Sequence, residues 1–181
     1  MSEHILVALR RAISFVEKAK VDYMVIGGYA LPFYGMIRAT IDIDLAVAIG
    51  SEAQFESFRR VAEDAGFDLT LGSFGEPECV FLDRETGLEI EFWMRPDGVE
   101  WNAETLSRRP RERFDEFQVW IISPEDFIVN KLARPDRGVQ DEKDVKSVLV
   151  RLQDALDRGY LEERARKAGV LSLLKVIDET E

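Results

Sequence analysis

The chain has 181 residues, a formal net charge of −11 and a hydrophobic content of 46%. This composition excludes a disordered tail, and no apolar run reaches the roughly 18 residues of a membrane span. The only histidine, His4, lies near the N-terminus, which excludes a multi-histidine metal site and Ser-His-Asp or Cys-His catalysis. Any catalysis must therefore rely on carboxylates. The first residues lack the features of a secretory signal and the single cysteine, Cys79, has no partner in the chain, so we expect a cytoplasmic protein with no membrane segment.

The N-terminal part predicts a helix, a strand, a glycine turn and a short helix. Apolar residues three and four positions apart predict an amphipathic helix over residues 3–19. A β-branched strand at 21–26 ends at Gly27 and Gly28, and residues 29–36 are compact enough for a short helix. Backbone N–H groups at such a turn can approach a phosphate closely, although a glycine pair alone is usually only a turn.

The next strand, predicted at residues 40–49, has one acidic face. Its odd-numbered positions are apolar, whereas Asp42 and Asp44 point to the opposite side. Side chains two residues apart on a strand are roughly 6 to 7 Å apart, so both carboxylates can converge on a cation. Oxygen donors without histidine suit Mg²⁺ or Mn²⁺. Alternating acids are also common on the hydrated side of an antiparallel strand, so the context must decide.

The middle of the chain predicts a second helix and further strands. Ser51 and Gln54 form a capping-box signal, and Gly66 ends the helix that follows. Short runs of β-branched and aromatic residues predict strands at residues 67–71, 79–82 and 88–93.

Glu89 and Glu91 share one face of the strand at 88–93. Either carboxylate would complete, together with Asp42 and Asp44, a site for two divalent ions around a nucleoside triphosphate. Carboxylates clustered without a cation have raised pKa values and cost stability, so clustering would favour a metal site. The alternative is a hydrated sheet face.

Residues 94–116 are polar and rich in helix breakers, which predicts a loop with one short helix near residues 103–108. This stretch contains one candidate basic strip on the acidic chain, formed by Arg108, Arg109, Arg111 and Arg113, with Arg95 nearby in sequence. Such a strip would permit contact with an RNA end; the alternative is a solvated loop.

The C-terminal part predicts a last strand at residues 117–122 and then helices. Ser123 and Pro124 are typical of a helix start. A break at 134–138 precedes a longer helix, and one or two more follow from Tyr160. The sequence therefore predicts an α/β core over residues 1–122 and a helical part over residues 123–181.

Two segments together resemble a known family. The first is GGYALPFYGMIRATIDIDL, from Gly27 to Leu45, and the second is SPEDFIVNKLARPDRGVQDEKDVKSVL, from Ser123 to Leu149. They resemble the nucleotidyltransferase superfamily with the polymerase-β-type fold, and most closely its bacterial branch that contains the AbiEii toxins. The resemblance covers residues 24–150 with gaps and implies an α/β (α+β) fold, with a mixed sheet flanked by helices.

The resemblance also implies roles for individual residues. Asp42, Asp44 and Glu91 would bind Mg²⁺, or Mn²⁺, and carry catalysis. The residues that would contact the nucleotide are Gly27, Gly28, Arg38, Thr40, Lys131 and Asp144. Asp141 and Asp144 match a later acidic motif, which would contact the nucleotide or secure Lys131 and Arg137; we expect the structural role for one of the two. Two positions depart from the family pattern, because Tyr29 replaces a serine that contacts phosphate and the third acid is a glutamate.

The implied reaction moves a nucleoside monophosphate from an NTP to a hydroxyl acceptor, an RNA end or a protein. Membership of the AbiEii-like branch would further imply a toxin with an antitoxin partner. Two alternatives use the same residues. One is a catalytically weak or inactive module that binds a nucleotide or a partner, and the other is a metal-dependent nuclease.

Overall fold

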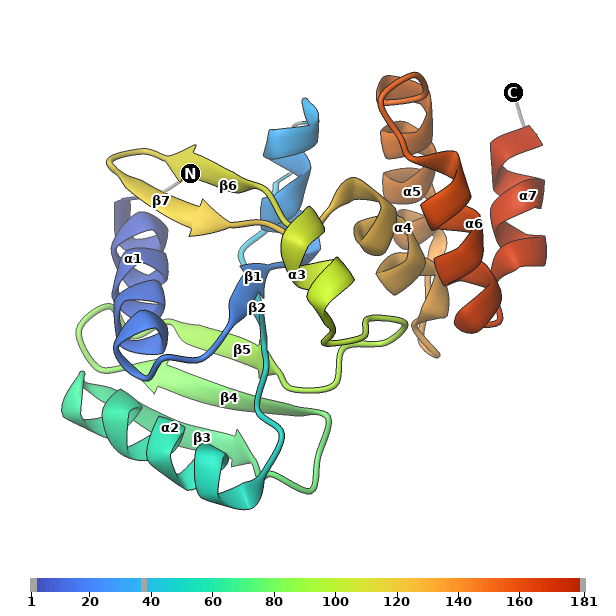
Figure 1. Cartoon of the computed structure of the whole chain (residues 1–181). Coiled ribbons are helices and arrows are strands. Elements are labelled where there is room, and N and C mark those ends of the chain that lie inside the picture. The colour runs from blue at the N-terminus through green and yellow to red at the C-terminus, as the bar shows by residue number, and fades with distance from the viewer. Residues whose placement is uncertain (1–2, 37–38, 180–181) are drawn as a thin grey trace. The chain divides into compact units, whose positions relative to one another are not determined.

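The computed structural model describes residues 3–36 and 39–179 (Figure 1). These residues divide into two compact units. Unit 1 comprises residues 3–29, 39–96 and 111–121, and unit 2 comprises residues 30–36, 97–110 and 122–179. Unit 2 thus takes two segments from the N-terminal side of residue 122. The domain boundary expected there stays a prediction, because a compact unit is not by itself a domain that folds alone.

Unit 1 contains a five-stranded mixed sheet with the strand order β1-β2-β5-β4-β3. The strands are β1 (Tyr23–Val25), β2 (Ile43–Val47), β3 (Phe67–Gly72), β4 (Glu78–Asp83) and β5 (Glu89–Trp93). β2 and β5 are parallel, and the other neighbours are antiparallel. The predicted fold class, a mixed sheet with helices and a helical C-terminal part, is confirmed.

Two helices, α1 (Glu3–Lys18) and α2 (Glu52–Asp64), cover one face of this sheet. Phe15 of α1 and Phe58 of α2 each lie 5.4 Å from the ring of Phe92 in β5. Phe67 and Phe81 complete this buried aromatic cluster. Each buried ring contributes about 2 to 3 kcal/mol through its removal from water. These packed rings form the hydrophobic core between the two helices and this face of the sheet.

Unit 1 also contains a hairpin that the sequence analysis predicted only in part. β6 (Arg111–Phe114) pairs with β7 (Phe117–Trp120), whereas we expected a loop up to residue 116. Phe114 is the only buried residue of β6, so the strand lacks the apolar alternation that identifies most strands. Asp115 adopts a positive φ of 55° in the turn, a conformation that aspartate tolerates better than most residues.

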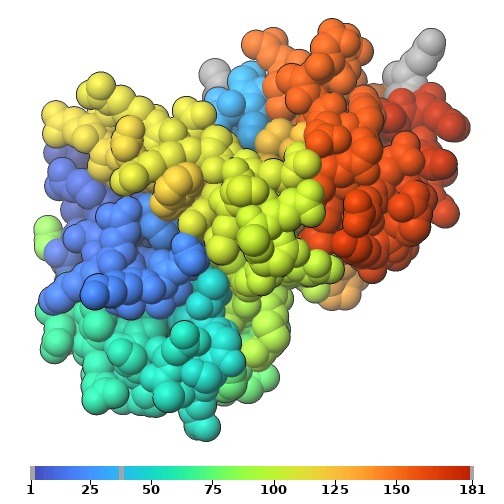
Figure 2. Space-filling model, in the orientation of Figure 1, coloured from blue at the N-terminus to red at the C-terminus, as the bar shows by residue number. Residues whose placement is uncertain are grey.

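Unit 2 is helical and contains most of the 3₁₀ helix η1 (Gly27–Tyr34), which begins in unit 1. Its other helices are α3 (Ala103–Arg108), α4 (Pro124–Ala133), α5 (Val139–Arg151), α6 (Arg158–Lys167) and α7 (Leu171–Glu179). α4 is buried along nearly its whole length, and its Phe127 ring packs edge-on against Tyr34. Side chains fill the space between the C-terminal helices, which are coloured orange to red in Figure 2.

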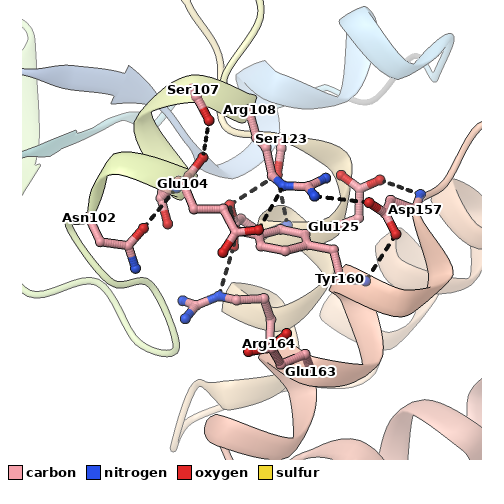
Figure 3. A network of polar contacts seen from close by, with 12 residues as sticks. Asn102, Glu104, Ser107, Arg108, Ser123, Glu125, Asp157, Tyr160, Glu163 and Arg164 are labelled. Carbon is pink, nitrogen blue, oxygen red and sulfur yellow. Dashed lines mark hydrogen bonds and ion pairs between the residues drawn. The ribbon is translucent and has the colours of Figure 1, made fainter.

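A polar network explains why α4 begins with Ser-Pro-Glu-Asp (Figure 3). Ser123 caps the helix by accepting a hydrogen bond from the backbone N–H of Asp126. The carboxylate of Asp126, only 1% exposed, accepts hydrogen bonds from the Tyr160 hydroxyl at 3.0 Å and from Arg164 Nε at 3.3 Å. Arg164 also donates to the carbonyl oxygen of Gly98. The hydrogen bonds of Asp126 therefore connect the start of α4 to α6 within unit 2.

None of the helices within the described residues is long and apolar enough to cross a membrane.

Candidate active site

Asp44 and Glu91 lie opposite each other on the parallel strands β2 and β5. Their carboxyl groups form a hydrogen bond. Burial, the charge of Asp44 and this hydrogen bond raise the pKa of Glu91 from 4.5 to about 7. Near neutral pH the two side chains therefore share a proton for part of the time, as expected for adjacent carboxylates.

These two carboxyl groups lie on the face of the sheet that α1 and α2 do not cover. Their chain neighbours Leu45 and Phe92 point to the opposite face and are fully buried, whereas Asp44 and Glu91 are half-buried. Among residues 3–36 and 39–179, Glu91 forms no ion pair with a lysine or an arginine. Its surroundings are acidic on a partly exposed surface, so a cation arriving from solvent would be attracted to it.

The glycine turn lies directly against this acidic pair. Gly27 has a φ of +63°, and a Cβ atom at this position would overlap Oδ2 of Asp44. A Cβ atom on Gly28 would lie 2.8 Å from Cγ2 of Thr40. Both positions therefore require glycine, and the start of η1 is brought close to the carboxylates of β2 and β5.

Tyr29 holds the segment that leads into β2. Its hydroxyl donates a hydrogen bond to the carbonyl oxygen of Thr40 at 2.9 Å. Burial, followed by the charge of Asp42, raises the pKa of Tyr29. Tyr29 stands where the sequence resemblance led us to expect a serine that contacts phosphate. Its hydroxyl instead contacts the backbone of the segment before β2.

Asp42 precedes the paired part of the strand. β2 begins at Ile43, and the ladder to β5 begins at the same residue, so the strand is shorter than the predicted 40–49. Ile41, expected on the core face, is 79% exposed, and Asp42 is exposed as well. Across the described ranges, no group of three or more His, Cys, Asp or Glu side chains is arranged to hold a metal ion. The structure thus brings together two of the three predicted carboxylates.

The sequence analysis left a choice between Glu89 and Glu91. Glu89 is exposed at the start of β5 and lies opposite Leu82 of β4. Glu91 is the one that contacts Asp44.

Two residues near Glu91 were not predicted. Glu78 of β4 adds to the charge that raises the pKa of Glu91, and the indole N–H of Trp93 forms a hydrogen bond to Glu91 that lowers it. Glu78 pairs with Trp93 across the antiparallel strands. Only the strand register reveals this proximity, because Glu78 and Glu91 are separated by a turn whose length does not fix the pairing.

The predicted nucleotide-binding residues Lys131 and Asp144 lie in unit 2, in an ion cluster with Asp141. The Lys131 side chain is 5% exposed, and its Nζ donates to Asp141 Oδ1 at 2.7 Å and lies 3.6 Å from Asp144 Oδ2. Burial raises the pKa of Asp141, but hydrogen bonds from Lys131 and from the backbone N–H of Gly138 outweigh burial, so the pKa is lowered. Lys131 is therefore neutralised by two carboxylates of its own unit.

Arg38, also predicted to bind the nucleotide, lies outside the described residues. Three residues of the predicted basic strip have partners within the chain, although Arg111 and Arg113 remain exposed. Arg108 pairs with Asp157 at 2.9 Å and stacks on the Tyr160 ring at 3.8 Å. In unit 1, Arg111 lies over the Trp120 ring and Arg113 donates to a carbonyl oxygen of its own turn.

Sequence comparison assigns the chain to a family. Residues 5–169 match the profile of the family described as "Nucleotidyl transferase of unknown function (DUF2204)". A comparison with curated proteins gave no match.

Several solved structures share the fold. The antibiotic-resistance factor ANT(2'')-Ia has a TM-score of 0.64 and 13% identity, and the alignment covers 97% of both chains. It has also been solved in complex with adenylyl-2''-tobramycin. The lincosamide antibiotic adenylyltransferase LnuA, bound to lincomycin, has a TM-score of 0.55 and 15% identity over 82% of this chain and 96% of that chain.

A further similar structure is an antigenic nucleotidyltransferase-like protein from Paracoccidioides brasiliensis. It has a TM-score of 0.56 and 17% identity over 95% of this chain and 91% of that chain. At these identities the structural similarities establish the fold.

Proposed function

Because the chain belongs to this family of nucleotidyl transferases, we propose that it transfers a nucleoside monophosphate from an NTP to a hydroxyl group of an acceptor. The observation that carries the proposal is the contact between Asp44 and Glu91 beside the turn at Gly27. A nucleotide site needs acids for a cation and backbone N–H groups for phosphate, and both features meet here.

We propose that Asp42, Asp44 and Glu91 bind Mg²⁺ or Mn²⁺. The donor set fits such an ion in its chemistry, because it consists of carboxylate oxygens and Glu91 has mainly acidic neighbours. Asp42 is two residues from Asp44 but is not gathered with the other two, so the proposal requires its segment to close on them. A bound ion would neutralise negative charge on the phosphates of the NTP.

The side chains of the site have separate tasks in this reaction. Gly27 and Gly28 let the backbone approach the triphosphate, and Thr40 and Arg38 contact the nucleotide. Glu91 helps to hold the ion and accepts the proton of the acceptor hydroxyl. The acceptor oxygen forms a bond to the α-phosphorus, the bond from that phosphorus to the bridging oxygen breaks, and pyrophosphate leaves.

Lys131 and Asp144 were expected to bind the nucleotide as well. Binding of phosphate by Lys131 requires its ammonium group to exchange contacts with Asp141 and Asp144 for contacts with the ligand. The buried ion cluster supports a stabilising role for both residues in unit 2, and their nucleotide contacts stay a prediction.

The acceptor is an RNA end or a protein according to the sequence resemblance. The structural neighbours add a third class, a small hydroxylated molecule, since their names and ligands include lincomycin and adenylyl-2''-tobramycin. The AbiEii-like branch, a toxin role, an antitoxin partner and a cytoplasmic location stay predictions from the sequence.

The transfer reaction can be tested with NTPs labelled at the α-phosphate and Mg²⁺. The acceptors to offer are total RNA, a protein mixture and a set of aminoglycosides and lincosamides. We expect a labelled product in one acceptor class, and a loss of about 1,000-fold in its rate with Asp44→Asn, equal to about 4 kcal/mol of transition-state stabilisation. The matched control is Asp68→Asn, which removes a partly exposed acid of the same unit that pairs with Arg84 at 3.5 Å.

Two results would contradict the proposal. One is a product that forms equally well with Asp44→Asn. The other is the absence of any product while nucleotide and Mn²⁺ still bind in calorimetry, which would favour the inactive nucleotide-binding module.

A further inference from the structure

Unit 2 carries an open groove of about 580 Å³ along α5. Three basic residues line it together with one hydroxyl and two apolar side chains, namely Lys143, Lys146, Arg151, Ser147, Met36 and Val150. The side of α5 that is packed into the unit carries Val145, Val148 and Leu149 instead.

The three basic groups of the groove are not neutralised within the unit. Lys143 and Arg151 are exposed and Lys146 is half-buried. In the parts of the chain that the structure describes, none of the three forms an ion pair. On a chain with a net charge of −11, such a concentration of positive charge is a local departure from the average.

The acidic residues of α5 are engaged elsewhere, which leaves the groove positive. Asp141 and Asp144 pair with the buried Lys131, and Glu142 pairs with Arg137 at 3.3 Å. Within the described part of α5, the acids are therefore paired with residues outside the groove, whereas the three bases that line the groove form no ion pair.

The basic groups follow the helix axis. Lys143, Ser147 and Arg151 occupy successive turns, with a rise of about 6 Å for every four residues and about 12 Å from the first to the last. Val150 is 66% exposed beside them. A single phosphate group is too small to contact both ends of this row, whereas an extended chain with repeated phosphates can do so.

We propose that this groove binds the phosphodiester backbone of a single-stranded nucleic acid. Lys143, Lys146 and Arg151 contact successive phosphates, and Met36 and Val150 provide apolar surface for the bases. The proposal goes beyond the transfer reaction and does not depend on it, because none of these residues was assigned to the candidate active site. Such binding weakens as the salt concentration rises, because its phosphate contacts release counterions.

Binding can be measured by fluorescence anisotropy with a labelled oligouridylate of about 12 nucleotides and with an oligothymidylate of equal length. ATP serves as the competitor that carries phosphate without a polymer backbone. We expect binding of at least one oligonucleotide, with a loss of at least about tenfold in the triple variant Lys143→Ala, Lys146→Ala, Arg151→Ala. Three phosphate contacts also predict that the slope of log K against log salt shrinks by about 2 in this variant.

The matched control is the triple variant Lys18→Ala, Arg166→Ala, Lys175→Ala, which removes the same charge at exposed positions outside the groove. Circular dichroism checks that both variants remain folded. Binding of RNA alone, of DNA alone or of both supports the proposal and identifies the source of the backbone.

Three results would overturn the proposal. The first is no binding of either oligonucleotide at about 50 mM salt, where phosphate contacts are strongest. The second is an equal loss of affinity in the two triple variants, which would mean a general charge effect. The third is displacement by ATP at the same phosphate concentration, which would mean a mononucleotide site.

Discussion

The acids of unit 1 and unit 2 are similar in sequence but differ in their surroundings. Asp141 and Asp144 of unit 2 enclose the ammonium group of Lys131, and the hydrogen bond from Lys131 helps lower the pKa of Asp141. Glu91 of unit 1 lies beside Asp44, and burial together with that second carboxylate raises its pKa to about 7.

This difference distinguishes acids that stabilise the fold from acids that are available to a ligand. Lys131, together with Arg134, whose Nη1 lies 4.0 Å from Asp141 Oδ1, balances the charges of Asp141 and Asp144, so a further cation gains little there. A carboxylate whose neighbours are acidic gains from a cation that arrives from solution. This difference favours unit 1 for the proposed cation site, although the sequence motifs of both units contain paired acids.

The largest effect on stability should come from removing the internal cation of unit 2. Lys131→Met removes the ammonium group that contacts the buried Asp144 and the partly buried Asp141, so we expect the free energy of unfolding to fall by about 3 kcal/mol in urea denaturation. Lys167→Met, which breaks the exposed pair with Glu163, is the control and should leave the urea midpoint unchanged. An equally small effect of Lys131→Met would remove the distinction between the two units.

A smaller effect, of opposite sign, is expected in unit 1. The folded-state pKa of Glu91 is raised, so its contribution to stability is fully present below pH 4.5 and is lost as the pH rises through about 7. Glu91→Gln removes this loss of stability, because the amide of glutamine does not ionise as the pH rises. We expect the variant to match the wild type at pH 5 and to exceed its free energy of unfolding by about 1 to 2 kcal/mol at pH 8.5, after allowance for solvent screening.

Urea unfolding of wild type and Glu91→Gln at both pH values measures this difference. Glu89→Gln, on the same strand but exposed, should show no such pH dependence. A stability gain that is the same at pH 5 and pH 8.5 would mean that packing, rather than charge, is responsible.

A third effect, no larger than that of Glu91→Gln, tests the contact between the glycine turn and Asp44. Gly27→Ala introduces a Cβ atom at positive φ against Asp44, so we expect a loss of about 1 to 2 kcal/mol in the free energy of unfolding. Gly75→Ala meets only Ser73 at 3.7 Å and serves as the control. Equal thermal midpoints for the two variants would show that the contact between Gly27 and Asp44 is not tight.

Local sequence signals predicted most of the fold. The caps at Ser51 and Ser123 mark the starts of α2 and α4, and apolar spacing predicted α1. β6 was missed because its charged residues give no strand alternation. The predicted strand at 40–49 began too early, because Ile41 fits the apolar pattern but the pairing of β2 with β5 begins only at Ile43.

Local motifs predicted which residues belong to the candidate site, but they did not predict which of these residues lie next to one another. Strand alternation placed Glu91 on the acidic face, but its position opposite Asp44 depends on the parallel register of β2 and β5, which the sequence does not display. The proximity of Glu78 depends on the same kind of long-range pairing. The enclosure of Lys131 by two acids also required tertiary structure, since the spacing of Asp141 and Asp144 fits a ligand site equally well.

The central claim is that the carboxylates around Asp44 and Glu91 bind a divalent cation. Isothermal calorimetry with Mn²⁺ at pH 7, in two buffers of different ionisation enthalpy, measures both the binding and the protons released. We predict binding to the wild type with release of about half a proton, because Glu91 has a pKa of about 7. We predict no such binding to Asp44→Asn and unchanged binding to Asp141→Asn. Binding that persists in Asp44→Asn but disappears in Asp141→Asn would contradict the account.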